Sequence, residues 1–205
     1  LHLCNKNMEK IPTSMTTHKL LAEVCLAAKY EGDSIKTHYP QYQEKYVNSG
    51  STICTVLARS FADIGDIVRG KDLYLGNKKK KQNGKKTERE KLEENLKRIF
   101  GNIYEGLTKT RGRNGKKSAK EYYEDKDTDK NFFQLREDWW TANRHTVWKA
   151  ITCKADNSNR YFRQTCNDNE TFSHANYNCR CKDKKGEHET DQVPTYFDYV
   201  PQYLR

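Results

Sequence analysis

The chain has 205 residues, of which 34% are hydrophobic and 32% are charged, and its formal net charge is +10. This length supports one hydrophobic core, and the low apolar fraction indicates that part of the chain forms solvated loops. No run of about 18 apolar residues is present, so any membrane anchor is expected to lie outside this sequence.

The first 50 residues carry two helical patterns. One runs from Leu20 to Ala28 and is expected to end at Gly32, because glycine commonly closes a helix. The second begins at Ser34 and is expected to be kinked or interrupted by Pro40, since proline removes a backbone donor. Its apolar positions are Ile35, Tyr39, Tyr42 and Tyr46.

Two longer helices with clear end signals follow. The first spans about residues 51–69 and is expected to end at Gly70. The second begins at Thr87, which forms a capping box with Glu90, and it continues to Leu107. Both patterns place apolar residues along one face, as in helices that pack on a core.

Residues 131–152 hold all three tryptophans, Trp139, Trp140 and Trp148, in one helical pattern with Asn131 as the expected N-cap. Because large aromatic side chains bury much apolar area, this helix is expected at the centre of a helical bundle. The charged residues interleaved with the aromatic ones are expected to be ion-paired helix flanks; they are Arg136, Glu137, Asp138, Arg144 and Lys149.

Residues 154–201 are rich in Asn, Asp, Gly and Lys and show no alternation that predicts a strand. The predicted fold class is therefore all-α: a helical bundle with long polar loops and a disulfide-stapled irregular C-terminal segment. Four aromatic residues near the end are expected in extended backbone and packed across the bundle, with exposure of some of them as the alternative; they are Tyr196, Phe197, Tyr199 and Tyr203.

Seven cysteines favour disulfides in an oxidising compartment over a reduced, intracellular protein. A zinc site is disfavoured, because the spacing Cys179-x-Cys181 is closer than zinc motifs use. The candidate zinc ligands are Cys166, His174, Cys179, Cys181 and His188. A bridge between Cys166 and Cys181 would close a short loop. The odd number leaves one cysteine, Cys4, for a partner outside the chain.

Two basic runs account for the net charge. They comprise Lys78, Lys79, Lys80, Lys81, Lys85 and Lys86, and then Lys109, Arg111, Arg113, Lys116, Lys117 and Lys120. Both are candidate binding surfaces for acidic glycans, because lysine and arginine pair with sulfate and carboxylate groups. The alternative is solvated loop without a dedicated ligand. Nucleic acid is disfavoured as a partner, because no aromatic residues are interleaved to stack bases.

No set of residues predicts catalysis, a cofactor or a metal ion. Asp63 and Asp66 share a helix face, but no nucleophile or histidine accompanies them, so salt bridges to Arg59 and Arg69 are expected. No G-x-S-x-G motif is present either. We therefore expect a protein that is not an enzyme.

Several long motifs occur in order along the chain. They are ARSFADIGDIVRGKDLY at 58–74, REDWWTANRHTVWKAITC at 136–153 and VPTYFDYVPQYLR at 193–205, with LHLCNK at 1–6 and LLAEVCLAAKYEG at 20–32. Together they resemble the alpha class of Duffy-binding-like domains, found in the variant erythrocyte surface antigens of the malaria parasite. The resemblance spans the chain except for the lysine-rich interruptions.

The resemblance implies a domain organisation and a disulfide pattern. Residues 1–17 would be a remnant of an N-terminal subdomain, residues 18–205 the second, helical subdomain, and a third subdomain would be absent. A bridge between Cys54 and Cys179 is implied, and Cys25 with Cys153 is the pair that remains. Asn169, in the sequon Asn169-Glu170-Thr171, would be unmodified, because the parasite has little machinery for N-linked glycans.

For function, the resemblance implies an adhesion module of a larger membrane protein, on the extracellular face of the infected red cell. The implied partners are host receptor proteins, heparin-like acidic glycans and antibodies, in cytoadhesion or rosetting and in antigenic variation. The alternative is a structural spacer and antigenic face whose receptor contacts lie in neighbouring domains.

Overall fold

The computed structural model describes residues 3–8, 17–45, 52–72, 86–110, 117–125, 130–155, 160–168, 171–183, 185–186 and 189–205. The helices in this part of the chain are α1 (Thr17–Lys45), α2 (Ile53–Arg69), α3 (Glu88–Glu105), α4 (Ala119–Tyr122) and α5 (Phe133–Ile151). Two strands, β1 (Gln164–Asp168) and β2 (Thr171–His174), and two 3-10 turns, η4 (Phe197–Tyr199) and η5 (Gln202–Leu204), follow. The predicted helical class is confirmed.

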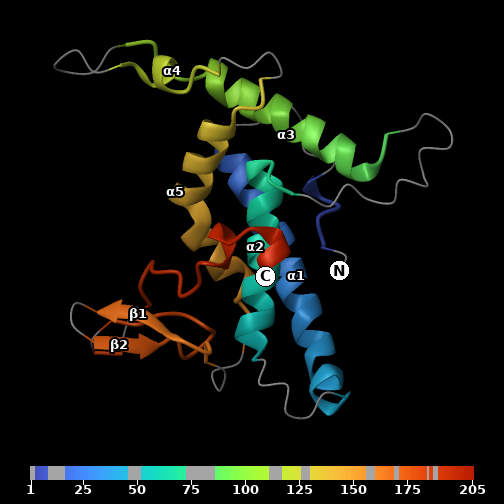
Figure 1. The fold of residues 1–205 in the computed structure, drawn as a ribbon, viewed down its shortest axis with the longest axis vertical. Helices are drawn as coiled ribbons and strands as arrows, with labels where there is room; N and C mark the ends of the chain where they lie inside the picture. The colour runs from blue at the N-terminus through green and yellow to red at the C-terminus, as the bar shows by residue number, and fades with distance from the viewer. Residues whose placement is uncertain are drawn as a thin grey trace.

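Three long helices, α1, α2 and α5, pack side by side, and α3 crosses one end of this group (Figure 1). The strands lie near the other end, beyond the C-terminus of α5. The last thirteen residues return across α2 and α5, and we call residues 193–205 the strap. In the described residues, no helix is sufficiently long and apolar to span a bilayer.

Helix α1 is continuous where two helices were predicted. Gly32 does not end it, because this glycine has another role: a Cβ atom there would lie 2.0 Å from the carbonyl oxygen of Ile151. The missing side chain lets α1 approach the end of α5 closely. Pro40 also lies inside the helix, which continues to Lys45. The prediction of an interruption at Pro40 was therefore wrong.

The end signals of α2 and α3 are confirmed. Gly70 follows α2 with φ 73°, in the left-handed region that favours glycine. The hydroxyl of Thr87 accepts from the amide of Glu90 at 3.2 Å, and the carboxylate of Glu90 accepts from the amide of Thr87 at 2.8 Å. Thr52, which precedes α2, is its N-cap.

The tryptophans of α5 are buried, as predicted, with 5%, 0% and 2% of Trp139, Trp140 and Trp148 exposed. The ring of Phe61 on α2 lies between two of them, with centroids 5.1 Å from Trp140 and 5.2 Å from Trp148. Trp139 instead meets Phe100 of α3 edge-on at 6.0 Å. The aromatic side chains of α5 therefore join α2 and α3 into one core.

The N-cap of α5 was predicted wrongly. The residue at this position is Phe132 rather than Asn131, and it has φ 54° and makes no side-chain capping bond. Its ring is buried against Tyr104, at a centroid distance of 5.5 Å, and the carboxylate of Asp125 accepts from its backbone amide at 2.6 Å. The start of α5 is therefore determined by the packing of the Phe132 ring in the core. The acceptor for the backbone amide of Phe132 is Asp125, seven residues earlier in the chain.

The C-terminal segment contains a β-hairpin that the sequence pattern did not indicate. Strands β1 and β2 pair antiparallel, with Asn167 opposite Phe172. Each strand has a single apolar residue, the buried Cys166 in β1 and the 65% exposed Phe172 in β2. The strands therefore lack the alternation of apolar and polar residues that normally reveals a strand. The bridge between Cys166 and Cys181 holds this hairpin instead of a buried apolar face.

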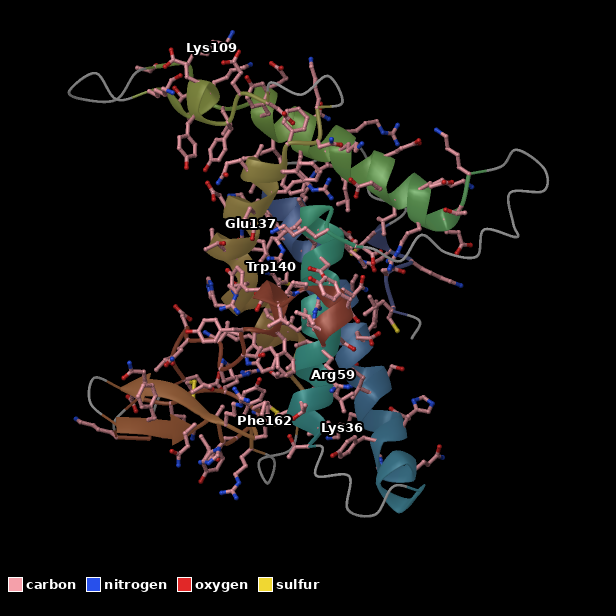
Figure 2. All side chains as sticks on the ribbon, viewed as in Figure 1. Lys36, Arg59, Lys109, Glu137, Trp140 and Phe162 are labelled. Atoms are coloured by element: carbon pink, nitrogen blue, oxygen red, sulfur yellow. A yellow bond between two sulfur atoms is a disulfide. The ribbon has the colours of Figure 1, made fainter. Side chains whose placement is uncertain are left out.

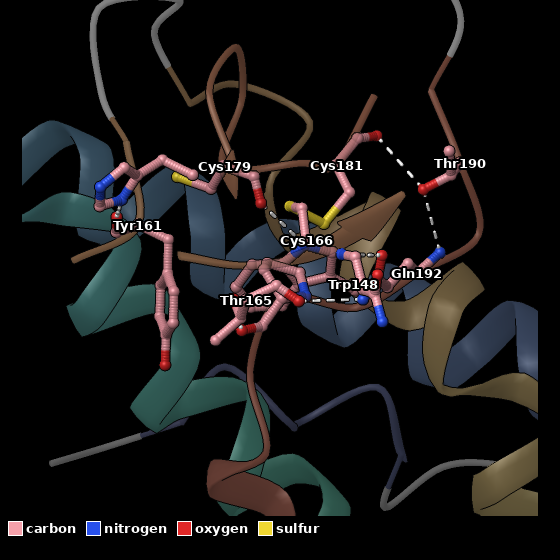
Figure 3. Close-up of a disulfide and its surroundings, with 11 residues drawn as sticks. Trp148, Tyr161, Thr165, Cys166, Cys179, Cys181, Thr190 and Gln192 are labelled. Carbon is pink, nitrogen blue, oxygen red and sulfur yellow. Dashed lines mark hydrogen bonds between the residues drawn. A yellow bond between two sulfur atoms is a disulfide. The ribbon is translucent and has the colours of Figure 1, made fainter. Parts of the chain in front are cut away.

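Two of the expected disulfides are present, Cys54–Cys179 and Cys166–Cys181. Figure 3 shows the second of them. The bridge between Cys54 and Cys179 connects α2 to the turn that follows β2, across 125 residues of sequence. It therefore joins the helical bundle to the C-terminal segment, as predicted.

The expected bridge between Cys25 and Cys153 is absent, and both cysteines are free, as is Cys4. Lys154, just after α5, pairs with Asp33 of α1 at 3.1 Å, so the end of α5 lies beside residues 32–33 of α1. Cys25 lies seven residues earlier on α1, which is about 10 Å along a helix. A disulfide allows no more than about 7 Å between Cα atoms, so this pair was assigned wrongly. The partner expected for Cys4 outside the chain stays a prediction.

Buried charges connect α2, α5 and the strap. Arg69, 1% exposed, donates to the carboxylates of Asp66 and of Glu137 on α5, each at 3.0 Å, and to the backbone carbonyl of Asp198 in the strap. Burial alone would raise the pKa of Glu137, but its bonds to Lys71 and Arg69 hold that pKa below the usual value. One arginine thus holds three segments that are distant in sequence.

Asp198 is the buried anion of the strap, with a side chain that is 0% exposed. Its carboxylate accepts from the indole nitrogen of Trp140 at 2.9 Å and twice from the guanidinium of Arg144 at 2.8 Å. The same guanidinium lies over the rings of Tyr199 and Tyr196, 5.2 and 5.9 Å from their centroids. The strap is therefore docked by hydrogen bonds, charge and cation–π contact together.

Four of the five charges of α5 are ion-paired as predicted, whereas Asp138 accepts hydrogen bonds from Tyr123 and Gln134. Arg136 is buried rather than a flank. Its guanidinium donates to the backbone carbonyls of Val68 at 2.6 Å and Ile67 at 3.1 Å, and it pairs with Glu93 of α3. A cation at the carbonyl end of a helix satisfies acceptors that have no partner within the helix. Arg136 thus fixes the end of α2 against α3.

We predict that Gly32→Ala lowers the unfolding free energy by at least about 2 kcal/mol, because the new methyl group must push α1 away from α5. Chemical denaturation followed by tryptophan fluorescence measures this. The control is Gly101→Ala on α3, where a Cβ would lie 3.5 Å from the ring of Phe132 and alanine should be neutral or stabilising by up to about 1 kcal/mol. Equal losses in the two variants would contradict the close-contact role of Gly32.

We also predict that Asp198→Ala costs about 3–5 kcal/mol, because it leaves the indole of Trp140 and the guanidinium of Arg144 without their acceptor. Asp198→Asn, which keeps one acceptor oxygen, should have an intermediate denaturation midpoint. The control is Asp191→Ala, which removes the surface pair between Asp191 and Lys149 and should leave the midpoint unchanged. Similar midpoints for Asp198→Ala and Asp191→Ala would show that the strap is not held as described.

Candidate functional site

Only part of each basic run lies within the described residues. These are Lys86 of the first run and Lys109, Lys117 and Lys120 of the second. The other eight lie outside the described residues: Lys78, Lys79, Lys80, Lys81, Lys85, Arg111, Arg113 and Lys116. The first run ends at Lys86, just before α3, and the second begins at Lys109, just after it (Figure 2). An 18-residue helix is about 27 Å long, so the two runs join the bundle at well-separated points.

Two of the described basic residues are engaged with α3. Lys86 pairs with Glu94, and Lys120 pairs with Glu105. The bond from Lys120 lowers the pKa of Glu105, and the ammonium of Lys120 also lies 5.0 Å from the ring centroid of Tyr104. Lys109 and Lys117 are exposed. The described parts of the runs thus contain both paired and exposed cations.

The acidic pair on α2 has a structural role, although one predicted partner was wrong. Asp66 pairs with Arg69, as expected, whereas Asp63 pairs with Arg205 of the strap at 3.1 Å and not with Arg59. Arg205 also pairs with Asp66. Burial raises the pKa of Asp63, and the charge of Arg205 opposes that rise. These carboxylates hold the end of the strap on α2.

The strap presents an aromatic surface, whereas packing across the bundle was the main expectation for these residues. Tyr196, Tyr199 and Tyr203 are 59%, 45% and 75% exposed, while Phe197 packs partly against the core. The backbone is also not extended there, because η4 and η5 each form a 3-10 turn. The geometry of the turn explains this exposure: Asp198 points inward, whereas Tyr196 and Tyr199, three residues apart, share the outer side.

A hollow of about 360 Å³ lies between the end of α2 and the strap. Asp66 and Arg69 line it from α2 and Lys71 from just after that helix. The strap contributes Asp198, Tyr199, Val200, Pro201 and Gln202. Tyrosine is among the side chains enriched at protein interfaces, and a hollow beside the exposed tyrosines suits a protruding side chain of a partner. The arrangement supports non-covalent binding.

The candidate zinc ligands that lie within the described residues have other structural roles. Cys166, Cys179 and Cys181 are in disulfides, and a ring nitrogen of His174 lies 2.8 Å from the carbonyl oxygen of Tyr161. His188 and the sequon residue Asn169 lie outside the described residues.

The family model described as the Duffy binding domain matches residues 1–205. The solved NTS-DBL1-alpha and CIDR-gamma double domain of PfEMP1 from the Plasmodium falciparum varO strain is 37% identical, with a TM-score of 0.69 and coverage of 99% of this chain and 25% of that one. The ICAM-1-binding PfEMP1 IT4var13 DBLbeta domain is 30% identical, with a TM-score of 0.62 and coverage of 99% and 39%. No curated protein matches the chain.

A further PfEMP1 DBLb domain, solved bound to human ICAM-1, is 27% identical, with a TM-score of 0.59 and coverage of 99% of this chain and 36% of that one. The chain therefore spans between 25% and 39% of the solved chains named here. The helical bundle agrees with the family match, which covers the whole sequence. The chain belongs to the Duffy binding domain family.

Proposed function

We propose that this chain is part of a host-receptor-binding adhesion module, displayed on the extracellular face of infected red cells within a larger membrane protein. The observation that carries this proposal is the family match over residues 1–205, together with two similar DBLβ domains whose descriptions include ICAM-1 binding. The module acts by non-covalent recognition, without catalysis or a cofactor, in cytoadhesion or rosetting.

Two surface features support a binding role. The exposed tyrosines of the strap are mounted on a bundle that buried charges and two disulfides hold rigid, so little conformational freedom is lost when they contact a partner. The basic runs add long-range attraction for acidic glycans of the heparin type. Sequence variation on this outer face would serve antigenic variation, with antibodies as further partners.

A second candidate function is a spacer and antigenic face, with receptor contacts in neighbouring domains. It is favoured by the small share of the solved chains that this sequence covers, since the remaining parts offer other surfaces. The two functions differ in what happens to cell adhesion when the surface of this chain is changed.

We predict that replacing all twelve residues of the basic runs by glutamine removes salt-sensitive retention on a heparin column. If these runs contact the receptor or its glycans, adhesion of cells displaying the complete protein should fall at least tenfold. The reason is that each lost cation removes an ionic contact and weakens electrostatic steering. Column elution at rising salt and counting of adherent cells under flow measure the two effects.

The control neutralises six basic residues elsewhere on the described surface: Lys19, Lys29, Arg59, Lys91, Lys97 and Lys185. It should be compared with variants that neutralise six residues of one run at a time. Equal retention of the control and the run variants would remove the runs from the mechanism. Loss of heparin retention with unchanged cell adhesion would support the spacer function instead.

A further inference from the structure

A short turn after β2 has an unusual backbone. Tyr177, Asn178 and Cys179 have φ values of 50°, 58° and 57°, so three consecutive residues with side chains lie in the left-handed region. A bridge between Asn176 and Arg180 closes the turn. This conformation is unfavourable for each L residue and persists only where surrounding contacts impose it.

The contacts that impose it come from two helices. Cys179 is bonded to Cys54 of α2, and its carbonyl accepts from the indole nitrogen of Trp148 at 3.0 Å (Figure 3). The guanidinium of Arg180 donates to the hydroxyl of Thr152 at 2.9 Å and to the carbonyl of Lys149 at 2.8 Å. Of these contacts, only the disulfide can be broken by a chemical reagent without a change in sequence.

The backbone at the second bridge, Cys166–Cys181, is not left-handed. This bridge joins Cys166 of β1 to Cys181, and neither residue has a positive φ. All four bridged cysteines are at most 2% exposed, so a reductant reaches either bond only when the local structure opens. Opening of the turn that bears Cys179 releases backbone strain, because its left-handed residues can relax. Opening of the hairpin that bears Cys166 releases no such strain.

The outer side of the turn is on the surface. The ring of Tyr177 is 47% exposed, and the ammonium of Lys182 lies 3.9 Å from its centroid. This pair depends on the left-handed backbone, which sets the direction of the tyrosine side chain. Release of the turn would therefore change an exposed aromatic and cationic feature while α2 and α5 keep their other contacts.

We propose that Cys54–Cys179 is the more readily reduced of the two bridges, and that its reduction by a dithiol is a conformational switch of the turn from Asn176 to Arg180. A thiolate of the dithiol attacks Cys179 or Cys54, breaks the S–S bond and forms a mixed disulfide. The second thiol of the reagent then displaces it, leaving two cysteine thiols and a cyclic disulfide. Two electrons and two protons pass from the dithiol to the bridge.

The test uses the oxidised chain with its free cysteines replaced, as Cys4→Ser, Cys25→Ala and Cys153→Ser. It is titrated with dithiothreitol, quenched by an alkylating agent and mapped by peptide mass. Cys54 and Cys179 are expected to be alkylated at concentrations several-fold below those needed for Cys166 and Cys181. Hydrogen exchange of residues 176–180 should rise at the same concentrations, before that of α2 and α5.

A matched pair of variants isolates the backbone strain. Tyr177→Ala and Tyr177→Gly both remove the exposed ring, but only glycine adopts the left-handed conformation without strain. The glycine variant is expected to need a few-fold more dithiothreitol than the alanine variant to reduce Cys54–Cys179, with no difference for Cys166–Cys181. The proposal is overturned by equal midpoints in this pair, by earlier reduction of Cys166–Cys181, or by reduction of Cys54–Cys179 only when the whole bundle unfolds.

Discussion

Arg69 and Asp198 meet in the interior of the molecule, where the guanidinium donates to the backbone carbonyl of the strap residue. Around this contact, α2 supplies Asp66, and α5 supplies Glu137 and Arg144. Ionised groups that are buried need complete pairing, since a missing partner is costly in a low-dielectric interior. The position of the strap relative to both helices is therefore specified by charge as well as by packing.

That constraint explains which side chains reach the surface. The turn η4 points Asp198 toward Trp140 and Arg144, and the neighbouring residues Tyr196 and Tyr199 are left outside, over the same guanidinium. The two tyrosines share one side because side chains three residues apart eclipse in a 3-10 turn, and Asp198 between them points to the interior. An aromatic surface suited to protein contact is thus a consequence of how the strap is anchored.

Much of the helical fold could be predicted from local sequence, because its signals are local. Gly70 ends α2 and Thr87 begins α3 through bonds to residues within four positions. The burial of Trp140 and Trp148 followed from side-chain size and helical spacing. The predicted helix end at Gly32 and the predicted N-cap at Asn131 were wrong for the opposite reason. A backbone atom at Ile151 determines the role of Gly32, and the ring of Tyr104 packs on Phe132, the actual N-cap; both partners are distant in sequence.

The surface was harder to predict than the core. Packing across the bundle was expected for the aromatic residues of the strap, in backbone that was expected to be extended. Their exposure depends on the pairing of Asp198 with two α5 residues more than 50 positions away. The hairpin was missed because a disulfide replaces the buried apolar face that would have marked its strands. The partner of Asp63 was missed because Arg205 is 142 residues away, whereas Arg59 is one helical turn away.

The central claim is that the strap and the helices under it form one cooperative unit. Native-state hydrogen exchange tests this most directly, through the amides of Tyr199 and Val200, which donate to the carbonyls of Tyr196 and Phe197 at 2.9 and 3.0 Å. The account predicts that these amides exchange with the same opening free energy as the slowest amides of α2 and α5, within about 1 kcal/mol. Exchange of the strap through a separate, low-energy opening while both helices stay protected would contradict it.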